Sequence, residues 1–208
     1  QLRRNELSIP SKPILNHSKN SRNTLHTGTF NNLVVYIRFA GEDEIVTPRQ
    51  SYDDRLNQPE GYSVKAFYWE TSYNQLTINS THYPPVENPE TTNASYIDQY
   101  ARNYYEPYDA TTNPDGYDGS TERRMREHQL LVNAINWINA NHPIPTDLNI
   151  DADDDGYVDN VCFMINGNSG AWADLLWAHR WALYTYDVSI NGKQVYDYTF
   201  QPENQVTV

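Results

Sequence analysis

A short acidic stretch is the part of this sequence best suited to do chemistry. Residues 149–165 read NIDADDDGYVDNVCFMI and hold five aspartates within nine positions, namely Asp151, Asp153, Asp154, Asp155 and Asp159. Two unit charges about 4 Å apart repel each other by about 1 kcal/mol in bulk water and by about 4 kcal/mol at an effective dielectric constant near 20. These carboxylates must therefore either spread into solvent or share a cation.

The spacing of the aspartates favours a shared cation. Calcium loops place carboxylates at positions 1, 3 and 5, a glycine at 6, a backbone carbonyl at 7 and often a further ligand at 9. Counted from the first aspartate, these positions hold Asp151, Asp153, Asp155, Gly156, Tyr157 and Asp159. We therefore predict a calcium site formed by four carboxylates and the Tyr157 carbonyl. The alternative is an acidic, solvated turn built on Asp-Gly chemistry.

Position 12 of this loop departs from the EF-hand pattern. An EF-hand needs a bidentate glutamate there, followed by a helix, whereas this chain has Cys162 within an apolar, β-branched run. The sequence thus predicts a calcium loop that leads into a strand at 161–165. Sulfur is a poor ligand for a hard cation, so we expect the single cysteine to be buried and free of metal.

Other catalytic patterns are missing from the sequence. It contains no phosphate-binding glycine loop, no G-x-S-x-G and no zinc-like Cys/His spacing. None of the histidines is followed by glutamate, so His-Glu-x-x-His is absent; they are His17, His26, His82, His128, His142 and His179. Glu70, Glu122 and Glu127 lie scattered, with nothing to pair them as acid and base. His128 lies on an apolar helix face and is interpreted as a packed, hydrogen-bonded residue.

The remaining patterns predict strands and helices that would position the acidic loop. Apolar or alternating runs predict strands at 32–41, 75–81 and 161–165. Apolar residues at helical spacing predict helices that start after Ser63 and that span 93–106 and 121–140. Asn191-Gly192 joins two alternating runs and predicts a hairpin. The sum is an α/β or α+β architecture with helices packed on a mixed, twisted sheet.

Length and charge limit the classes of function. The chain has 208 residues and a formal net charge of −12, which argues against a nucleic-acid partner. Its longest apolar runs are too short for a membrane span, and its start has no signal-peptide pattern. We expect an extended leader or pro-segment remnant over 1–30 and one domain over 31–208. Weak calcium loops are occupied at millimolar calcium, so we expect a secreted, cell-surface or periplasmic location.

Three stretches, taken in order, resemble the immune inhibitor A family of secreted zinc metallopeptidases. They are SVKAFYWETSYNQLTI, DADDDGYVDNVCFMING and WAHRW, the last followed by the Asn-Gly hairpin. The resemblance covers about residues 30–203, and it departs from the family at Asn74, where glycine is usual. It also departs at the family's zinc site, a His-Glu-x-x-His helix downstream of such a hairpin, which this chain does not contain.

The resemblance implies a zincin-like fold and the amino-terminal sub-domain of an exported zinc-dependent endopeptidase. The catalytic zinc would belong to the intact protein, and this chain alone is expected to be inactive, with a structural calcium ion as its own cofactor. Its partners would be the rest of the peptidase domain and a protein or peptide substrate. Trp177, His179 and Trp181 share one face if extended, and the resemblance makes them candidates for the substrate cleft; a core-facing aromatic strand is the alternative.

Two further interpretations of the whole chain stay open. One is a calcium-stabilised extracellular binding or adhesion module whose many tyrosines and tryptophans form a ligand surface. The other is a non-catalytic relative of the peptidases that is retained as a scaffold. The coding sequence after Val208 separates them from the peptidase interpretation.

Overall fold

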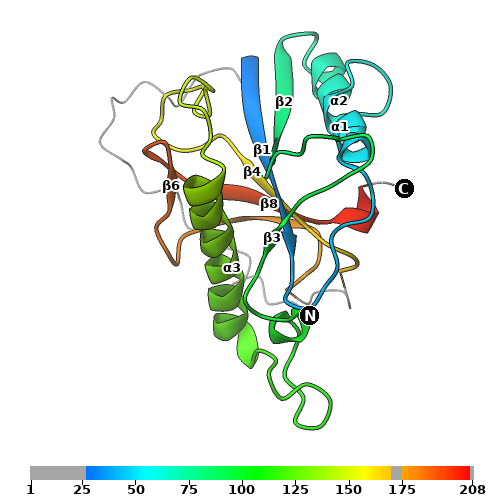
Figure 1. The fold of residues 1–208 in the computed structure, drawn as a ribbon. Helices are drawn as coiled ribbons and strands as arrows, with labels where there is room; N and C mark the ends of the chain where they lie inside the picture. The colour runs from blue at the N-terminus through cyan, green and yellow to red at the C-terminus, as the bar shows by residue number, and fades with distance from the viewer. Residues whose placement is uncertain (1–26, 170–174, 207–208) are drawn as a thin grey trace.

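A mostly parallel sheet forms the centre of the molecule (Figure 1). The computed structural model describes residues 27–169 and 175–206. Within them the order of the main strands is β2-β1-β4-β8-β5, and β3 pairs with the end of β1. The strands are β1 (Gly28–Arg38), β2 (Leu76–Tyr83), β3 (Tyr96–Ile97), β4 (Val161–Ile165), β5 (His179–Ala182) and β8 (Asp197–Pro202). Only β5 of these six runs antiparallel to its neighbour.

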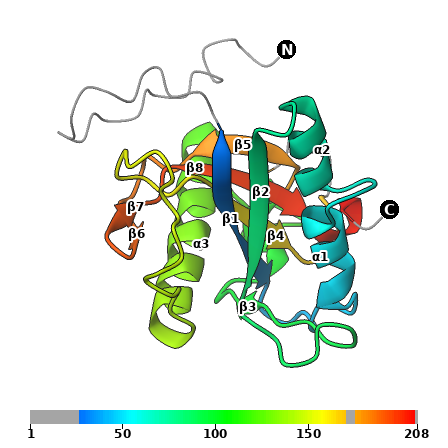
Figure 2. The same cartoon turned by 90° about the horizontal axis from the view of Figure 1, so that it is seen from above.

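Helices cover both faces of the sheet, so the described residues form three layers (Figure 2). Helix α3 (Gly119–Asn141) lies on one side, and α1 (Arg49–Asn57) and α2 (Val64–Thr71) lie on the other. Short 3-10 turns, η3 (Arg102–Tyr105) and η4 (Glu203–Gln205), and the β6–β7 hairpin (Ser189–Ile190 and Lys193–Gln194) complete the structure. This mixed α/β architecture confirms the fold class predicted from the sequence.

The central strands are buried on both faces, which explains their continuous apolar sequences. On β1, Leu33, Val35 and Ile37 pack in the core that includes α3. Val34 and Tyr36 alternate with them and pack in a second core, with residues of α1. A parallel central strand is thereby fixed in register, since a shift by one residue would exchange its two faces.

The long helix α3 buries most of the stripe predicted for 121–140, but Met125 at its start is 44% exposed. Leu131, Ala134, Ile135 and Ile138 are at most 1% exposed and pack in the large core. The helix ends at Asn141, just before Pro143, a residue that cannot continue the hydrogen-bond pattern. Helix α2 begins after Ser63, whose hydroxyl accepts the Ala66 N–H at 3.0 Å, as its sequence predicted.

The helix predicted over 93–106 is wrong. Tyr96 and Ile97 instead pair with the end of β1, and only a 3-10 turn forms at 102–105. Asp98 is 1% exposed and accepts hydrogen bonds from the hydroxyls of Tyr96 and Tyr105. These tertiary contacts outweigh the helical spacing of the tyrosines, because a short isolated helix is only marginally stable.

Other predictions agree with the structure within a few residues. The strand predicted at 32–41 begins earlier, at Gly28, and the strand at 75–81 extends to Tyr83. The hairpin forms at Asn191-Gly192, although its paired strands are short and the second run continues as β8. Residues 1–26 of the predicted leader lie outside the described residues. No helix in the described residues is long and apolar enough to cross a bilayer.

Candidate functional site

The aspartate loop connects α3 to β4, and Asp151 organises its turn. The Asp151 side chain is 1% exposed. Its Oδ1 accepts the Asp155 N–H at 2.9 Å, and its Oδ2 accepts the Gly156 N–H at 3.0 Å. Gly156 has a φ of +88°, a left-handed conformation that glycine adopts without the strain a Cβ would cause. The side chain of the first aspartate thus closes the loop by accepting from two backbone N–H groups.

Three of the predicted ligands converge. One carboxylate oxygen each from Asp151, Asp153 and Asp159 lies within 4.8 Å of the others, and no other such group of three His, Cys, Asp or Glu side chains occurs among the described residues. Burial, together with the nearby charges of Asp153, Asp151 and Asp155, raises the pKa of Asp159 to about 6, although the Ala152 N–H acts in the opposite direction. Three carboxylates that converge in a partly buried place repel one another, and a cation between them would offset that repulsion.

Asp155 and Tyr157 are placed differently from the other predicted ligands. The Asp155 carboxylate does not belong to the cluster of three, and its Oδ1 accepts the Tyr157 N–H at 2.9 Å. The Tyr157 side chain is 3% exposed and packs with Ala182 and Tyr196. The oxygen donors and their separation fit a hard divalent cation, with Asp151, Asp153 and Asp159 as its carboxylate ligands.

A lysine that the sequence pattern did not indicate also contacts this site. Lys193 on β7 places its Nζ 2.7 Å from Asp151 Oδ2 and 3.5 Å from Asp154 Oδ1. Burial alone would raise the pKa of Asp151, but the ammonium and the two backbone N–H groups outweigh it and lower that pKa. Lys193 follows the hairpin turn, so only a prediction of where the hairpin lies against the loop could have revealed it.

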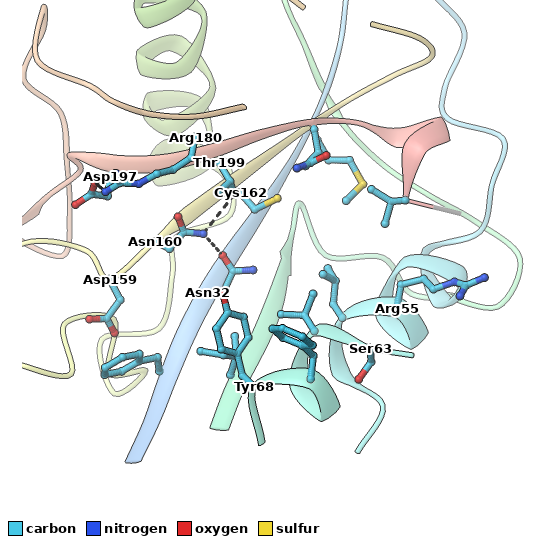
Figure 3. Close-up of a pocket in the computed structure, with 18 of the residues that line it drawn as sticks. Asn32, Arg55, Ser63, Tyr68, Asp159, Asn160, Cys162, Arg180, Asp197 and Thr199 are labelled. Atoms are coloured by element: carbon cyan, nitrogen blue, oxygen red, sulfur yellow. Dashed lines mark hydrogen bonds and ion pairs between the residues drawn. The ribbon is translucent and has the colours of Figure 1, made fainter. Parts of the chain in front are cut away.

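A groove of about 1180 Å³ begins beside the loop and runs over the face of the sheet that carries α1 and α2 (Figure 3). Asp159, Arg180 and Asp197 lie toward one end of it, and Arg55 and Ser63 toward the other. Its floor includes Cys162, and its aromatic residues include Tyr62, Phe67 and Tyr68, which are 96%, 59% and 43% exposed.

Polar residues cross the floor of the groove at its acidic end. The Asn160 side chain donates to Asn32 Oδ1 at 2.6 Å, which joins β1 to the start of β4. Arg180 on β5 forms an ion pair with Asp197 on β8. The groove therefore combines an apolar, aromatic part with a polar, acidic part, a composition common in binding sites.

The residues proposed for a substrate cleft lie away from this groove. Trp177, His179 and Trp181 are partly buried and are absent from its lining, while Arg180 between them belongs to it. Trp181 packs against the core that includes α3. The His179 ring lies between Trp177 and Phe200, with centroid distances of 5.6 Å and 5.4 Å. His179 and Trp181 lie on the extended strand β5, whereas Trp177 lies before it.

A buried polar cluster lies under β5, and the sequence analysis missed it by treating Glu127 as unpaired. His179 Nε2 lies 2.7 Å from Glu127 Oε1, and the Tyr198 hydroxyl donates to the same oxygen. On the next position of α3, His128 is fully buried and its Nδ1 lies 2.7 Å from Thr185 Oγ1. The interpretation of His128 as a packed, hydrogen-bonded residue is thus confirmed.

Comparison with known proteins adds no assignment to this geometry. No protein-family model matches the chain, and a search of curated protein sequences finds no match.

Proposed function

We propose that this chain is the amino-terminal sub-domain of an exported zinc-dependent endopeptidase, in which it supplies the sheet, a structural calcium site and one wall of the substrate cleft. The observation that supports this best is the aspartate loop. Asp151, Asp153 and Asp159 converge within 4.8 Å in the second of the three stretches that carry the resemblance to the immune inhibitor A family. A calcium ion there would stabilise the loop that leads into β4.

The position of β5 supports the cleft wall. It lies at the end of the strand order among the described residues and pairs with β8 alone. A strand at a sheet edge offers backbone N–H and C=O groups to an extended peptide, and alternate side chains then contact that peptide. His179 and Trp181 lie on one face of this strand and Arg180 on the other.

Zinc chemistry would require residues outside this chain. A catalytic zinc site needs three protein ligands, an open position for water and a general base. The described histidines form no such group, and the sequence has no His-Glu-x-x-His. We therefore derive no catalytic step for this chain and expect it to be inactive by itself.

Metal analysis and a peptide-cleavage assay test this proposal. The purified chain should hold no stoichiometric zinc and should cleave no peptide, whereas the coding sequence after Val208 should contain His-Glu-x-x-His. A longer protein that includes this motif should cleave peptides, and exchange of the motif's glutamate for glutamine should abolish cleavage. Cleavage by the purified chain, or a downstream sequence without the histidine pair, would contradict the proposal.

The groove favours a second candidate function, a calcium-stabilised extracellular binding module. Tyr62, Phe67 and Tyr68 expose large aromatic surfaces beside a concave site, as residues of binding surfaces often do. This candidate predicts that the gene lacks the zinc motif. It also predicts that the chain binds a ligand in the groove and that Tyr68→Ala abolishes this binding. A non-catalytic peptidase relative would also lack the zinc motif, but its function as a scaffold would not depend on the aromatic residues of the groove.

A further inference from the structure

A buried ion pair joins edge strand β5 to helix α3 on the face of the sheet opposite the groove. The side chains of His179 and Glu127 are 9% and 11% exposed. His179 Nε2 lies 2.7 Å from Glu127 Oε1, and His179 Nδ1 lies 2.7 Å from the Trp177 carbonyl oxygen. Both ring nitrogens of one histidine are therefore in contact with an oxygen.

The partners of His179 determine its protonation state. A backbone carbonyl oxygen can only accept a hydrogen bond, so Nδ1 must carry a proton. Glu127 Oε1 already accepts a hydrogen bond from the Tyr198 hydroxyl, and His179 Nε2 lies on the same oxygen as a possible second donor. An ionised Glu127 can likewise only accept, so Nε2 must then carry a proton as well, and His179 is an imidazolium beside a carboxylate.

We propose that Glu127 is a positioning residue that holds His179 as an imidazolium and thereby fixes edge strand β5 against α3. The anchoring itself follows from the contacts of this chain. Its consequence for catalysis rests on the proposed function, in which β5 forms a wall of the substrate cleft.

An edge strand has special need of such an anchor. β5 is four residues long and receives backbone hydrogen bonds from β8 alone among the described strands. Loss of one proton from His179 would turn a ring nitrogen into an acceptor that faces another acceptor, either Trp177 O or Glu127 Oε1. One of the two contacts would then break, and β5 would be held less firmly.

The charges around the pair agree with this assignment. Burial opposes the charge of His179, but the Glu127 carboxylate and the Trp177 carbonyl outweigh it and raise the pKa of His179, against the cation of Arg123. Burial opposes the charge of Glu127 as well, but His179 and the Tyr198 hydroxyl lower its pKa. Two more titratable groups act on this cluster through their charge, Arg124 on His128 and Tyr184 on Tyr198.

His128 provides an internal comparison within the same helix. Burial, with help from Arg124 and His179, lowers its pKa to about 4, although Glu127 acts in the opposite direction. Its Nε2 has no hydrogen-bond partner in the described part of the chain. His128 should therefore be neutral at pH 7, while His179, which shares the Tyr198 ring as a neighbour, should be charged.

Nitrogen NMR of the histidine rings tests the protonation state in the full chain. At pH 7 His179 should show two protonated ring nitrogens, and His128 should show one. The substitution Glu127→Gln keeps the size of the side chain but removes its charge. We expect it to lower the proton affinity of His179 by at least about tenfold. A neutral His179 at pH 7 in the unmodified chain, or an unchanged titration in the variant, would overturn the proposal.

Amide hydrogen exchange tests the anchoring. In Glu127→Gln, exchange of the 179–182 amides should rise at least about tenfold relative to those of β4. The matched control is Glu122→Gln on the same helix, whose carboxylate pairs with Arg126 and should leave β5 unchanged. In the unmodified chain, β5 exchange corrected for its intrinsic rate should rise as His179 loses its proton. Equal exchange in both variants would contradict the proposal.

Two further measurements keep the inference separate from the proposed function. If Glu127→Gln fails to fold, the pH dependence of β5 exchange in the unmodified chain decides the matter, together with Tyr198→Phe, which removes one donor to Glu127. In the longer peptidase, Glu127→Gln should raise KM more than it lowers kcat. Absence of peptidase activity would refute the proposed function, while the NMR and exchange results would stand.

Discussion

Calcium should stabilise the folded chain, and the Asp153→Asn substitution should remove most of that effect. A ligand that binds only the folded state stabilises it by about 2.7 kcal/mol at a hundredfold excess over its dissociation constant. Unfolding entropy is about 2.1 cal/mol/K per residue, so the roughly 175 residues that the structure describes give roughly 0.4 kcal/mol per kelvin. Saturating calcium should therefore raise the melting temperature by about 7 °C.

The choice of Asp153 makes the result informative. Its side chain is exposed, unlike that of Asp151, so its exchange for asparagine should leave the metal-free fold intact. It also removes one of three converging negative charges, and the metal-free protein should become slightly more stable. We therefore expect Asp153→Asn to have a slightly higher melting temperature than the unmodified chain in chelator, and to show little further increase when calcium is added.

Asp154→Asn is the matched control for this experiment. The Asp154 side chain is 93% exposed and lies outside the converging group. Its backbone has a φ of 55°, which asparagine tolerates well. This variant should keep the full thermal shift. Equal melting curves in calcium and in chelator, or equal loss in both variants, would refute the calcium assignment.

Lys193 offers a second perturbation with the opposite sign. Its ammonium contacts Asp151 and must be displaced, at least in part, when a cation binds there. Lys193→Gln should lower the stability of the metal-free protein and tighten calcium binding about two- to fivefold, as expected for a partly exposed ion pair. Calcium titration by calorimetry measures both effects. Weaker calcium binding in this variant would show that Lys193 does not compete for the site.

Four other predictions concern stability and reactivity. The Glu127–His179 pair should stabilise the fold most between about pH 4.5 and 6.5. Its contribution should decline as pH rises through the raised pKa of His179 and as pH falls through the lowered pKa of Glu127. Denaturant midpoints measured as a function of pH test this. Cys162 should react slowly with thiol reagents in the native state, because it is 7% exposed and burial raises its pKa to about 11. Gly192→Ala should cost about 1 kcal/mol by denaturant unfolding, since its φ is +81° although no atom lies within 4 Å of the added Cβ. Ile135→Ala should cost about 2–5 kcal/mol in the same assay, because the side chain is 1% exposed in the main core.

Each of these has a control or a contrary outcome. A pH profile that Glu127→Gln leaves unchanged would show that the pair does not set it. Rapid native labelling of Cys162 would show that the groove opens to its floor. Gly61→Ala has a similar φ, also +81°, with open space around it, and should match Gly192→Ala if backbone conformation alone sets the cost. A small effect of Ile135→Ala would show that the core closes around the lost volume.

Local patterns predicted those features whose residues are close in the sequence. The aspartates of the loop lie within nine positions, and the apolar runs of β1 and β4 are continuous, so spacing alone identified them. The hairpin depended on two adjacent residues, Asn191 and Gly192, both with positive φ. Each of these signals comes from the local conformational preference of the chain.

The features that the sequence did not predict depend on contacts between distant segments. Helix α1 carries few apolar residues, and it is anchored by Arg49, which is 3% exposed. The Arg49 guanidinium donates to Asn93 Oδ1, to the Pro84 carbonyl and to the Ala94 carbonyl. No periodic pattern in residues 49–57 encodes these partners. The same reason explains Glu127 and His179, which are 52 positions apart.

The acidic loop and the edge strand are connected through one continuous segment, residues 193–202. Gln194 accepts the Val158 N–H at 2.9 Å and donates to the Gly156 carbonyl at 3.0 Å, so β7 is hydrogen-bonded to the loop itself. A few residues later the same segment becomes β8, which pairs with β4 on one side and with β5 on the other. A cation that rigidifies the loop would therefore also restrict the start of β8, and through β8 the strand that Glu127 and His179 hold from the opposite face. With a cation bound, the two polar clusters would thus act on the same side of the sheet, one through the backbone of residues 193–202 and one through the Glu127–His179 pair.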